Sequence, residues 1–373
     1  MFRIYITAKA LANVYLQEHS KGYAEQNDWF HILLKQQKIF TVGYTEPLGD
    51  VIEEEDFSDS AIIAEMSTAY NIQFIPSDNY INDVIRDNSR VYDQPNSAFF
   101  IDIDGDVANH IQNTYGVICQ PASTDVDTTM FTSECLRFEY VKNKDVKGGW
   151  QELFEVQSSV PSNALCIIDR FLFAYDGQNN TNQGYESEIT YNGLDTVLLI
   201  LNSALPKIFK NTYHVTIICE KKQIKNRMIF QTLQQELFYR IKSISNIKGY
   251  PILAQLIAVD DDLARYTHSL THNRQIISNY HKMSFQNGIN AIRFYHGSEG
   301  NAEYTQTVQG ELLYSSGLKH YKSECPEDSI RATQIAMKSV LKKWNNSFEP
   351  GHYYYADNLG NSSIRNFQNR LFS

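Results

Sequence analysis

The sequence predicts an α/β protein with two domains, and three observations support this prediction. Short apolar runs bounded by turn residues, typical of buried strands, alternate with segments whose apolar residues recur at helical spacing. The 373 residues also exceed the roughly 100–200 residues that one domain usually takes. Finally, residues 120–163 lack apolar periodicity and contain Gly148, Gly149 and Pro161. We therefore place the boundary there, with domains at 1–150 and 151–373.

The first domain is expected to contain strand–helix–strand units of a parallel sheet. The apolar run Ala98–Ile103, which ends before Gly105, favours a buried strand, and a helix over Asp106–Tyr115 follows it and ends at Gly116. Such units build parallel sheets. Further strands are expected at Phe2–Thr7, Ile72–Ile75 and Val117–Cys119. Further helices are expected over Ala8–Glu18, Asp28–Gln37, Ala61–Tyr70 and Ile81–Arg86.

The second domain has stronger strand patterns. Its nearly continuous apolar runs predict buried strands at Ala164–Ala174, His214–Cys219 and Pro251–Val259. Ile229–Ile241 repeats its apolar residues at helical spacing and predicts a helix. A strand at Thr271–Asn279 is expected to pair with Ile289–Phe294, and further helices are expected over Leu194–Ile208 and Ser329–Trp344. In the tail Gly351–Ser373, the aromatic run Tyr353–Tyr355 suits a packing anchor, with base stacking as the alternative.

Composition narrows the class of protein. No run of about 18 apolar residues predicts a transmembrane helix, and the first residues lack the pattern of a signal peptide. The five cysteines are odd in number, scattered and without a CxxC pair, which argues against a disulfide framework and against a cysteine-based zinc site. These features favour a cytoplasmic location.

Charge is distributed unevenly along the chain. The net charge is −10, and residues 1–130 contain 20 acidic residues against 7 Lys and Arg. Residues 205–250 contain nine Lys and Arg against two acidic residues. A local basic face can attract a phosphate-bearing ligand despite a negative net charge, although a solvated helix face would show the same pattern. The candidate binding residues of this segment are Lys221, Lys222, Lys225 and Arg227.

The segment from His272 to Asn279 has the spacing H-x-R-x-x-x-x-N. On a strand, residues two apart point to the same face, so His272 and Arg274 would contact one phosphate together. The histidine would attack phosphorus, the arginine would stabilise the developing charge, and Asn279 would help to hold the site. The alternative is a polar pair on the exposed face of a strand.

This spacing resembles the H-x-K-x-x-x-x-D pattern of the phospholipase D superfamily. Residues of about 160–295 are similar to the phospholipase D-like domain at the C-terminus of MIT-domain proteins. The H-D-R segment of that family corresponds to His272, Asn273 and Arg274, its glycine-bearing strand to Gly288, and its Asp-aromatic marker to Asp169-Arg170-Phe171. The resemblance implies a mixed sheet flanked by helices that binds lipid or phosphate without cleaving it. It adds Asp169 and Arg170 to the candidate site.

The departures from the catalytic pattern leave three functions open. Arg274 replaces the lysine and Asn279 replaces the aspartate, which suits binding of nucleic acid, a nucleotide or a phosphoinositide without turnover. A metal-independent nuclease would need a second histidine, and since neither His19-Ser20-Lys21 nor His320-Tyr321-Lys322 suits a strand, it would act as a homodimer. An interaction module that binds a protein partner, for example in a bacterial defence complex, is the third function. No cofactor is expected.

A second motif, Phe99–Asp106, has the sequence FFIDIDGD. It resembles the opening motif of haloacid dehalogenase-type phosphatases, which implies Asp102 as nucleophile and Asp104 as general acid beside Mg²⁺, with Asp260–Asp262 as a later acidic motif. Asp106 stands where that family prefers threonine. The alternative is an acidic turn that closes a strand, with Asp106 as the N-cap of the next helix.

Overall fold

The computed structural model describes the chain in segments: residues 3–7, 39–43, 68, 73–76, 79–94, 97–121, 137–140, 145–146, 150–155, 160–173, 188–189, 193–224, 226–260, 274–285, 288–289, 292–295, 302–304, 308–312 and 353–372. The helices expected over 8–18, 28–37 and 329–344, most of the one over 61–70, and the two H-x-K triplets lie outside these residues. Among the described residues, no helix has both the length and the apolar character needed to cross a membrane.

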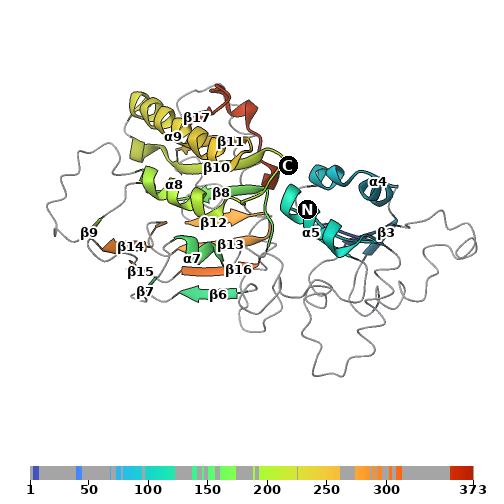
Figure 1. Ribbon diagram of the computed structural model, residues 1–373. Helices are drawn as coiled ribbons and strands as arrows, with labels where there is room; N and C mark the ends of the chain where they lie inside the picture. Colours follow the sequence, from blue (N-terminus) through green and yellow to red (C-terminus); the bar gives the residue numbers. More distant parts are fainter. Residues whose placement is uncertain are drawn as a thin grey trace, which may run out of the picture.

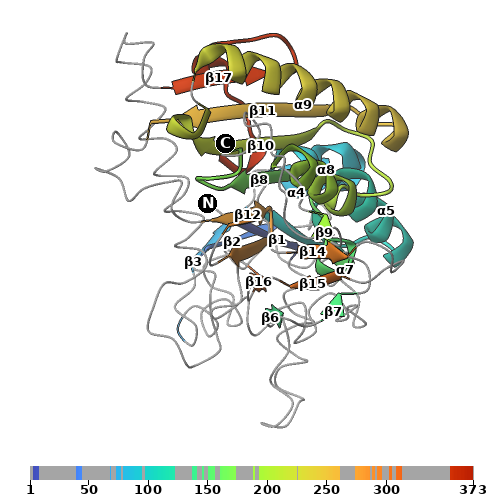
Figure 2. The ribbon, with the colours of Figure 1, turned by 90° about the vertical axis from the view of Figure 1, so that its left-hand side faces the viewer.

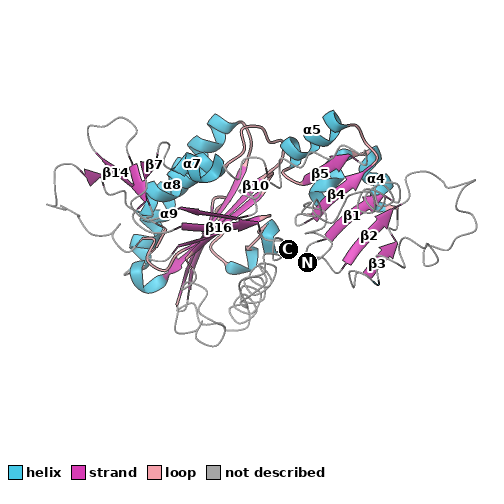
Figure 3. Cartoon of the chain, turned by 90° about the horizontal axis from the view of Figure 1, so that it is seen from below, coloured by secondary structure: helices cyan, strands magenta, loops and turns pink. Residues whose placement is uncertain are grey.

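The first sheet has five parallel strands in the order β3-β2-β1-β4-β5. Figure 3 shows it beside the second sheet. Its core is built from Tyr5, Phe99 and apolar residues of two helices, and the rings of Tyr5 and Phe99 stack with centroids 4.8 Å apart. The elements are β1 (Arg3–Thr7), β2 (Ile39–Gly43), β3 (Gln73–Pro76), α4 (Tyr80–Arg86), the 3-10 helix η2 (Asn88–Asp93), β4 (Ser97–Ile101), α5 (Gly105–Tyr115) and β5 (Ile118–Pro121).

The second sheet has eight strands in the order β17-β11-β10-β8-β12-β13-β16-β6, and Figure 1 shows them stacked from top to bottom in this order. The central strands β8, β10 and β11 are parallel, and the neighbours on both sides are antiparallel. The strands are β6 (Arg137–Tyr140), β8 (Ala164–Ile168), β10 (Tyr213–Glu220), β11 (Ile252–Val259), β12 (Gln275–Ser278), β13 (His281–Phe285), β16 (Val308–Leu312) and β17 (Tyr353–Asp357).

A small antiparallel sheet has the order β7-β15-β14-β9. Its strands are β7 (Asp145–Val146), β9 (Glu188–Ile189), β14 (Ile292–Tyr295) and β15 (Ala302–Tyr304). The fold is thus α/β, as predicted. The strands β6 and β7 precede residue 150 but pair with strands of the second half of the chain.

Helices cover one face of the second sheet, and Figure 2 shows α9 lying along β11 and β17. Leu233, Leu237 and Ile241 recur at four-residue spacing on α9 and are buried in the core that also contains alternate residues of β10 and β11. This spacing predicted the helix, which is longer than expected at both ends. The remaining helices are α7 (Trp150–Glu155), α8 (Gly193–Ala204), α9 (Arg227–Lys248) and the 3-10 helices η4 (Lys221–Ile224), η5 (Ile364–Asn366) and η6 (Arg370–Phe372).

Three expected elements end or pair differently. The strand expected to reach Ala174 ends at Ile168, because the Asp169 carboxylate accepts a hydrogen bond from the Phe171 N–H and turns the chain. The strand over Thr271–Asn279 forms β12 and pairs with β13 through a tight turn, and not with Ile289–Phe294. The N-cap of α5 is Asp104 and not Asp106.

The two large sheets meet at a hydrogen-bonded junction. The buried Tyr280 hydroxyl donates to the Ser97 carbonyl (2.7 Å) and accepts from the Ile118 N–H (3.0 Å). The Arg370 guanidinium lies 3.4 Å from the ring centroid of Tyr92. Because these contacts join segments from both halves of the sequence, they fix the two sheets against each other.

The pKa of His214 on β10 reports on the packing at this junction. Its Nδ1 lies 3.4 Å from the Gln368 carbonyl, and burial, followed by the charge of Arg370, lowers its pKa from 6.5 to about 4. Below pH 6.5 the unfolded chain therefore binds a proton that the folded protein does not bind until about pH 4. The free energy of unfolding is expected to decrease as the pH is lowered through this range. NMR titration of the ring should give a midpoint near 4, and His214→Gln should reduce the loss of stability between pH 7 and 5. A midpoint near 6.5 would contradict this.

Candidate functional site

The carboxyl ends of β8 and β10 bring together most of the predicted site residues. Asp169 and Arg170 follow β8, and Glu220 ends β10. Since β12 is antiparallel to β8 and Gln275 pairs with Ile168, Arg274 lies at the same edge. Ligands of open α/β sheets usually bind outside the carboxyl ends of parallel strands.

Asp169 organises the backbone of this edge. Its side chain is buried, Oδ1 accepts from the Phe171 N–H (2.9 Å), and Oδ2 accepts from the Ile289 N–H (2.7 Å). Burial raises the pKa of Asp169, although both hydrogen bonds and the charge of Arg274 favour the ionised form. Gly288 is next to this carboxylate, with φ +126° and an ideal Cβ position only 3.3 Å from Oδ2.

Arg170 forms a bidentate ion pair with Glu220. Its Nε and Nη2 donate to the two carboxylate oxygens at 2.8 Å each, and the Glu220 side chain is fully buried. Gln223 donates to the same carboxylate at 2.9 Å. Although burial raises the pKa of Glu220, the hydrogen bonds from Arg170 and Gln223 bring it below its ordinary value. The pair fixes the Arg170 guanidinium in one orientation.

Phe171 is an exposed aromatic ring within cation–π distance of two guanidinium groups. Its exposed fraction is 41%, and its ring centroid lies 5.3 Å from the Cζ atom of Arg170 and 5.6 Å from that of Arg274. These distances are typical of cation–π contacts. Sequence reasoning placed Phe171 in the Asp-aromatic marker but did not name it as a site residue. The signal that could have found it is an aromatic residue directly after a strand-ending aspartate and an arginine.

The basic residues of the 205–250 segment continue this edge. Lys221 and Lys222 follow β10, and the Lys221 Nζ lies 4.9 Å from the ring centroid of Tyr354. Arg227 is the first residue of α9, whose N-cap Asn226 accepts from the Ile229 N–H (3.0 Å). Lys225 lies outside the described residues. The positive end of the α9 dipole therefore adds to these cations.

The structure does not bring Asn279 to this edge. Asn279 follows β12 at its other end, about 16 Å along the strand from Arg274 at the usual rise per residue. It is fully buried, accepts from the Asn163 and Ala164 N–H groups (2.8 and 3.0 Å), and donates to Asn163 Oδ1 (2.9 Å). Asn279 thus ties two segments together and cannot contact the same phosphate as Arg274. His272 and Asn273 lie outside the described residues.

The alternative metal residues Asp102 and Asp104 follow β4 in the first sheet. Asp104 is exposed, and Asp260 follows β11 in the second sheet. Within the described part of the chain, no group of three or more His, Cys, Asp or Glu side chains could hold a metal ion. The acidic residues proposed for a phosphatase thus belong to two different sheets.

No model of a protein family matches the chain, and no curated protein matches it.

Proposed function

We propose that the second half of the chain binds a nucleotide unit of single-stranded nucleic acid at the carboxyl ends of β8 and β10. Phe171 stacks on the base, and Arg274, with His272 beside it in sequence, contacts the phosphate. The site is a phospholipase D-like site that binds phosphate and does not cleave it.

The observation that carries this proposal is the exposed Phe171 ring, which has the Arg170 and Arg274 guanidinium groups within cation–π distance. Aromatic rings flanked by basic side chains are the usual platform for unpaired bases. Arginine adds a planar group that matches phosphate oxygens, and it remains charged at all physiological pH values. A ring that is 41% exposed beside two guanidinium groups also has no evident role in the core.

The surrounding charge supports the same ligand. Glu220 neutralises Arg170, Asp169 is next to Arg274, and Asp260 follows β11 at the same edge. With Lys221, Lys222 and Arg227 added, the described cations of this edge still outnumber its carboxylates. This excess stands out in a chain with a net charge of −10. A local positive field of this kind attracts polyanions.

The resemblance to the phospholipase D-like family also supports the proposal. It selected Asp169, Arg274 and Gly288, and Asp169 is more than 100 residues from the other two in sequence. These residues are neighbours in space. The charge of Arg274 acts to lower the pKa of the Asp169 carboxyl, and the N–H of Ile289, the residue after Gly288, donates a hydrogen bond to it.

The test is the affinity for short labelled single-stranded DNA and RNA oligonucleotides, measured by fluorescence anisotropy at several salt concentrations. Phe171→Ala is expected to weaken binding by about 5–150-fold, since stacking of one base contributes about 1–3 kcal/mol. Arg274→Met should weaken binding and lower the salt slope by about 0.7, the value for one phosphate contact on a single strand.

Two matched variants control for a general loss of aromatic or basic surface. Tyr239→Ala removes an aromatic side chain on α9 that is 70% exposed, and Arg86→Met removes an exposed guanidinium from α4. Both should bind as the natural chain does. Equal affinities for the natural chain, the two site variants and the two control variants would refute the proposal, as would no binding of any oligonucleotide.

Cleavage of the same oligonucleotides in EDTA separates binding from hydrolysis. We expect no products. Products that disappear in His272→Ala, from a protein that elutes as a dimer in gel filtration, would establish the nuclease alternative instead.

A further inference from the structure

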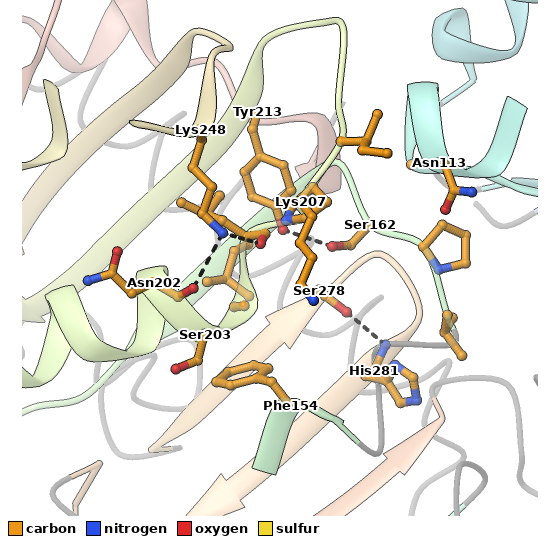
Figure 4. A pocket seen from close by; sticks show the side chains of 18 of the residues that line it. Asn113, Phe154, Ser162, Asn202, Ser203, Lys207, Tyr213, Lys248, Ser278 and His281 are labelled. Carbon is orange, nitrogen blue, oxygen red and sulfur yellow. Dashed lines mark hydrogen bonds between the residues drawn. The ribbon is translucent and has the colours of Figure 1, made fainter. Parts of the chain in front are cut away.

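A cavity of about 680 Å³ lies at the junction of the two large sheets, away from the edge that contains Phe171. Figure 4 shows its lining from close by. Asn113 comes from α5 of the first half, Ser203 from α8, and Ser278 and His281 from the two ends of the β12–β13 turn. The volume is within the usual range for small-molecule sites. Gln112, Asn113 and Gly116 of the first half line it together with residues of the second half, so a ligand in the cavity would contact both.

The described lining residues include cations but no aspartate or glutamate. Lys207 and Lys248 are the two lysines, and His281 is a buried histidine. The Lys248 Nζ donates to the carbonyls of Leu205 (2.8 Å) and Asn202 (3.4 Å), which fixes it at the C-terminal end of α8. Burial, and then the charge of Lys207, lowers the pKa of Lys248, so the two like charges are close enough to disfavour each other. An anion between them would relieve this repulsion.

Hydroxyl groups and apolar side chains complete the walls. The Ser162 and Tyr213 hydroxyls are hydrogen bonded at 2.9 Å, and burial raises the pKa of Tyr213, so this phenol keeps its proton. The Ser278 hydroxyl oxygen accepts from the His281 N–H at 3.1 Å. Figure 4 shows the Lys207 side chain extending toward Ser278, and Phe154 is one of the apolar side chains that line the cavity. Polar groups at fixed positions on a partly apolar wall are typical of specific ligand pockets.

We propose that this cavity binds a small organic anion, whose phosphate or carboxylate group is held by Lys207 and Lys248, and that the ligand braces the two sheets against each other. The size of the cavity limits the ligand to a small molecule. The ligand contacts both halves of the chain, so its binding stabilises the docked arrangement over any arrangement in which they separate.

The proposal is tested with the full chain by isothermal titration calorimetry, with pyrophosphate as the phosphate probe and citrate as the carboxylate probe. At least one probe should bind, and the stronger one identifies the class of anion. Lys207→Met should weaken its binding tenfold or more, since a charge-assisted hydrogen bond contributes at least that much. Ser203→Phe, which fills the cavity from α8, should abolish binding.

Two controls assign the binding to this cavity. Lys210→Met removes the same charge from the same loop, but Lys210 does not line the cavity, so binding should be unchanged. Phe171→Ala alters the proposed nucleic-acid site and should also leave the binding of pyrophosphate and citrate unchanged. No binding of either probe, or binding that Lys207→Met and Ser203→Phe leave intact, would overturn the proposal without affecting the site at Phe171.

Discussion

Replacing Asn279 with aspartate is expected to lower the free energy of unfolding by about 2–4 kcal/mol and to create no hydrolytic activity. This substitution restores the aspartate of the phospholipase D pattern. The Asn279 Nδ2 donates to Asn163 Oδ1, so an aspartate would place two oxygens against each other at a fully buried position. The Asn163 amide has further partners, since its Nδ2 donates to the carbonyls of Tyr115 and Gly116. The loss would therefore spread to the junction between the sheets.

Urea unfolding followed by circular dichroism measures this effect. Asn279→Ala should be destabilised to a similar extent, because it leaves two buried backbone N–H groups without their acceptor. Asn366→Asp makes the same chemical change at an exposed position and should have little effect. An Asn279→Asp protein that is as stable as the natural chain and cleaves nucleic acid would show that Asn279 belongs to a catalytic site.

Replacing Gly116 with alanine is expected to lower the free energy of unfolding by about 3–5 kcal/mol. Gly116 ends α5 with φ +63°, a conformation that side chains rarely adopt. An ideal Cβ would also lie 2.2 Å from the Ser162 carbonyl oxygen and 2.9 Å from the Asn163 nitrogen. Both are backbone atoms of the second half of the chain, so the two sheets would have to move apart.

Gly249→Ala separates the two causes of this loss. Gly249 ends α9 with φ +78°, but an ideal Cβ there meets no heavy atom within 4 Å. It should therefore show only the conformational cost, about 1–2 kcal/mol. Thermal or urea unfolding of both variants gives the difference. Equal losses for Gly116→Ala and Gly249→Ala would mean that the sheets are not in close contact at Gly116.

The sequence predicted the elements whose pattern is local. The strands β4, β10 and β11 are uninterrupted apolar runs, and α5 combines helical spacing with a glycine at its end, so each was expected within two residues. The helix α9 was expected from its helical spacing, but it continues seven residues beyond Ile241. The strands β7 and β9 have two residues each and carry no periodicity. The strand β17 pairs with β11 from a distant part of the chain, and its Tyr-rich sequence gave no sign of its partner. The interpretation of these tyrosines as a packing anchor agrees with the burial of Tyr355.

The candidate site was predicted in part, for a physical reason. Asp169, Arg170 and Arg274 share an edge because strand order places the end of β8 beside the start of β12. Asn279 was assigned to the same site only because it follows His272 by seven residues. A shared site would require the strand to fold back within those seven residues. Spacing also could not find the cavity at the junction, since Asn113, Ser203 and His281 come from three separate parts of the sequence.

The late position of β17 has a consequence for synthesis of the chain. All eight residues of β11 are buried, and β17 covers its outer edge. About 90 residues separate these strands, so at about 5–20 residues per second the ribosome needs roughly 5–20 s to supply the partner strand. During this interval the nascent protein exposes an apolar strand edge, the kind of surface on which chains aggregate. Efficient folding of this protein therefore depends on protection of β11 until translation reaches Tyr353.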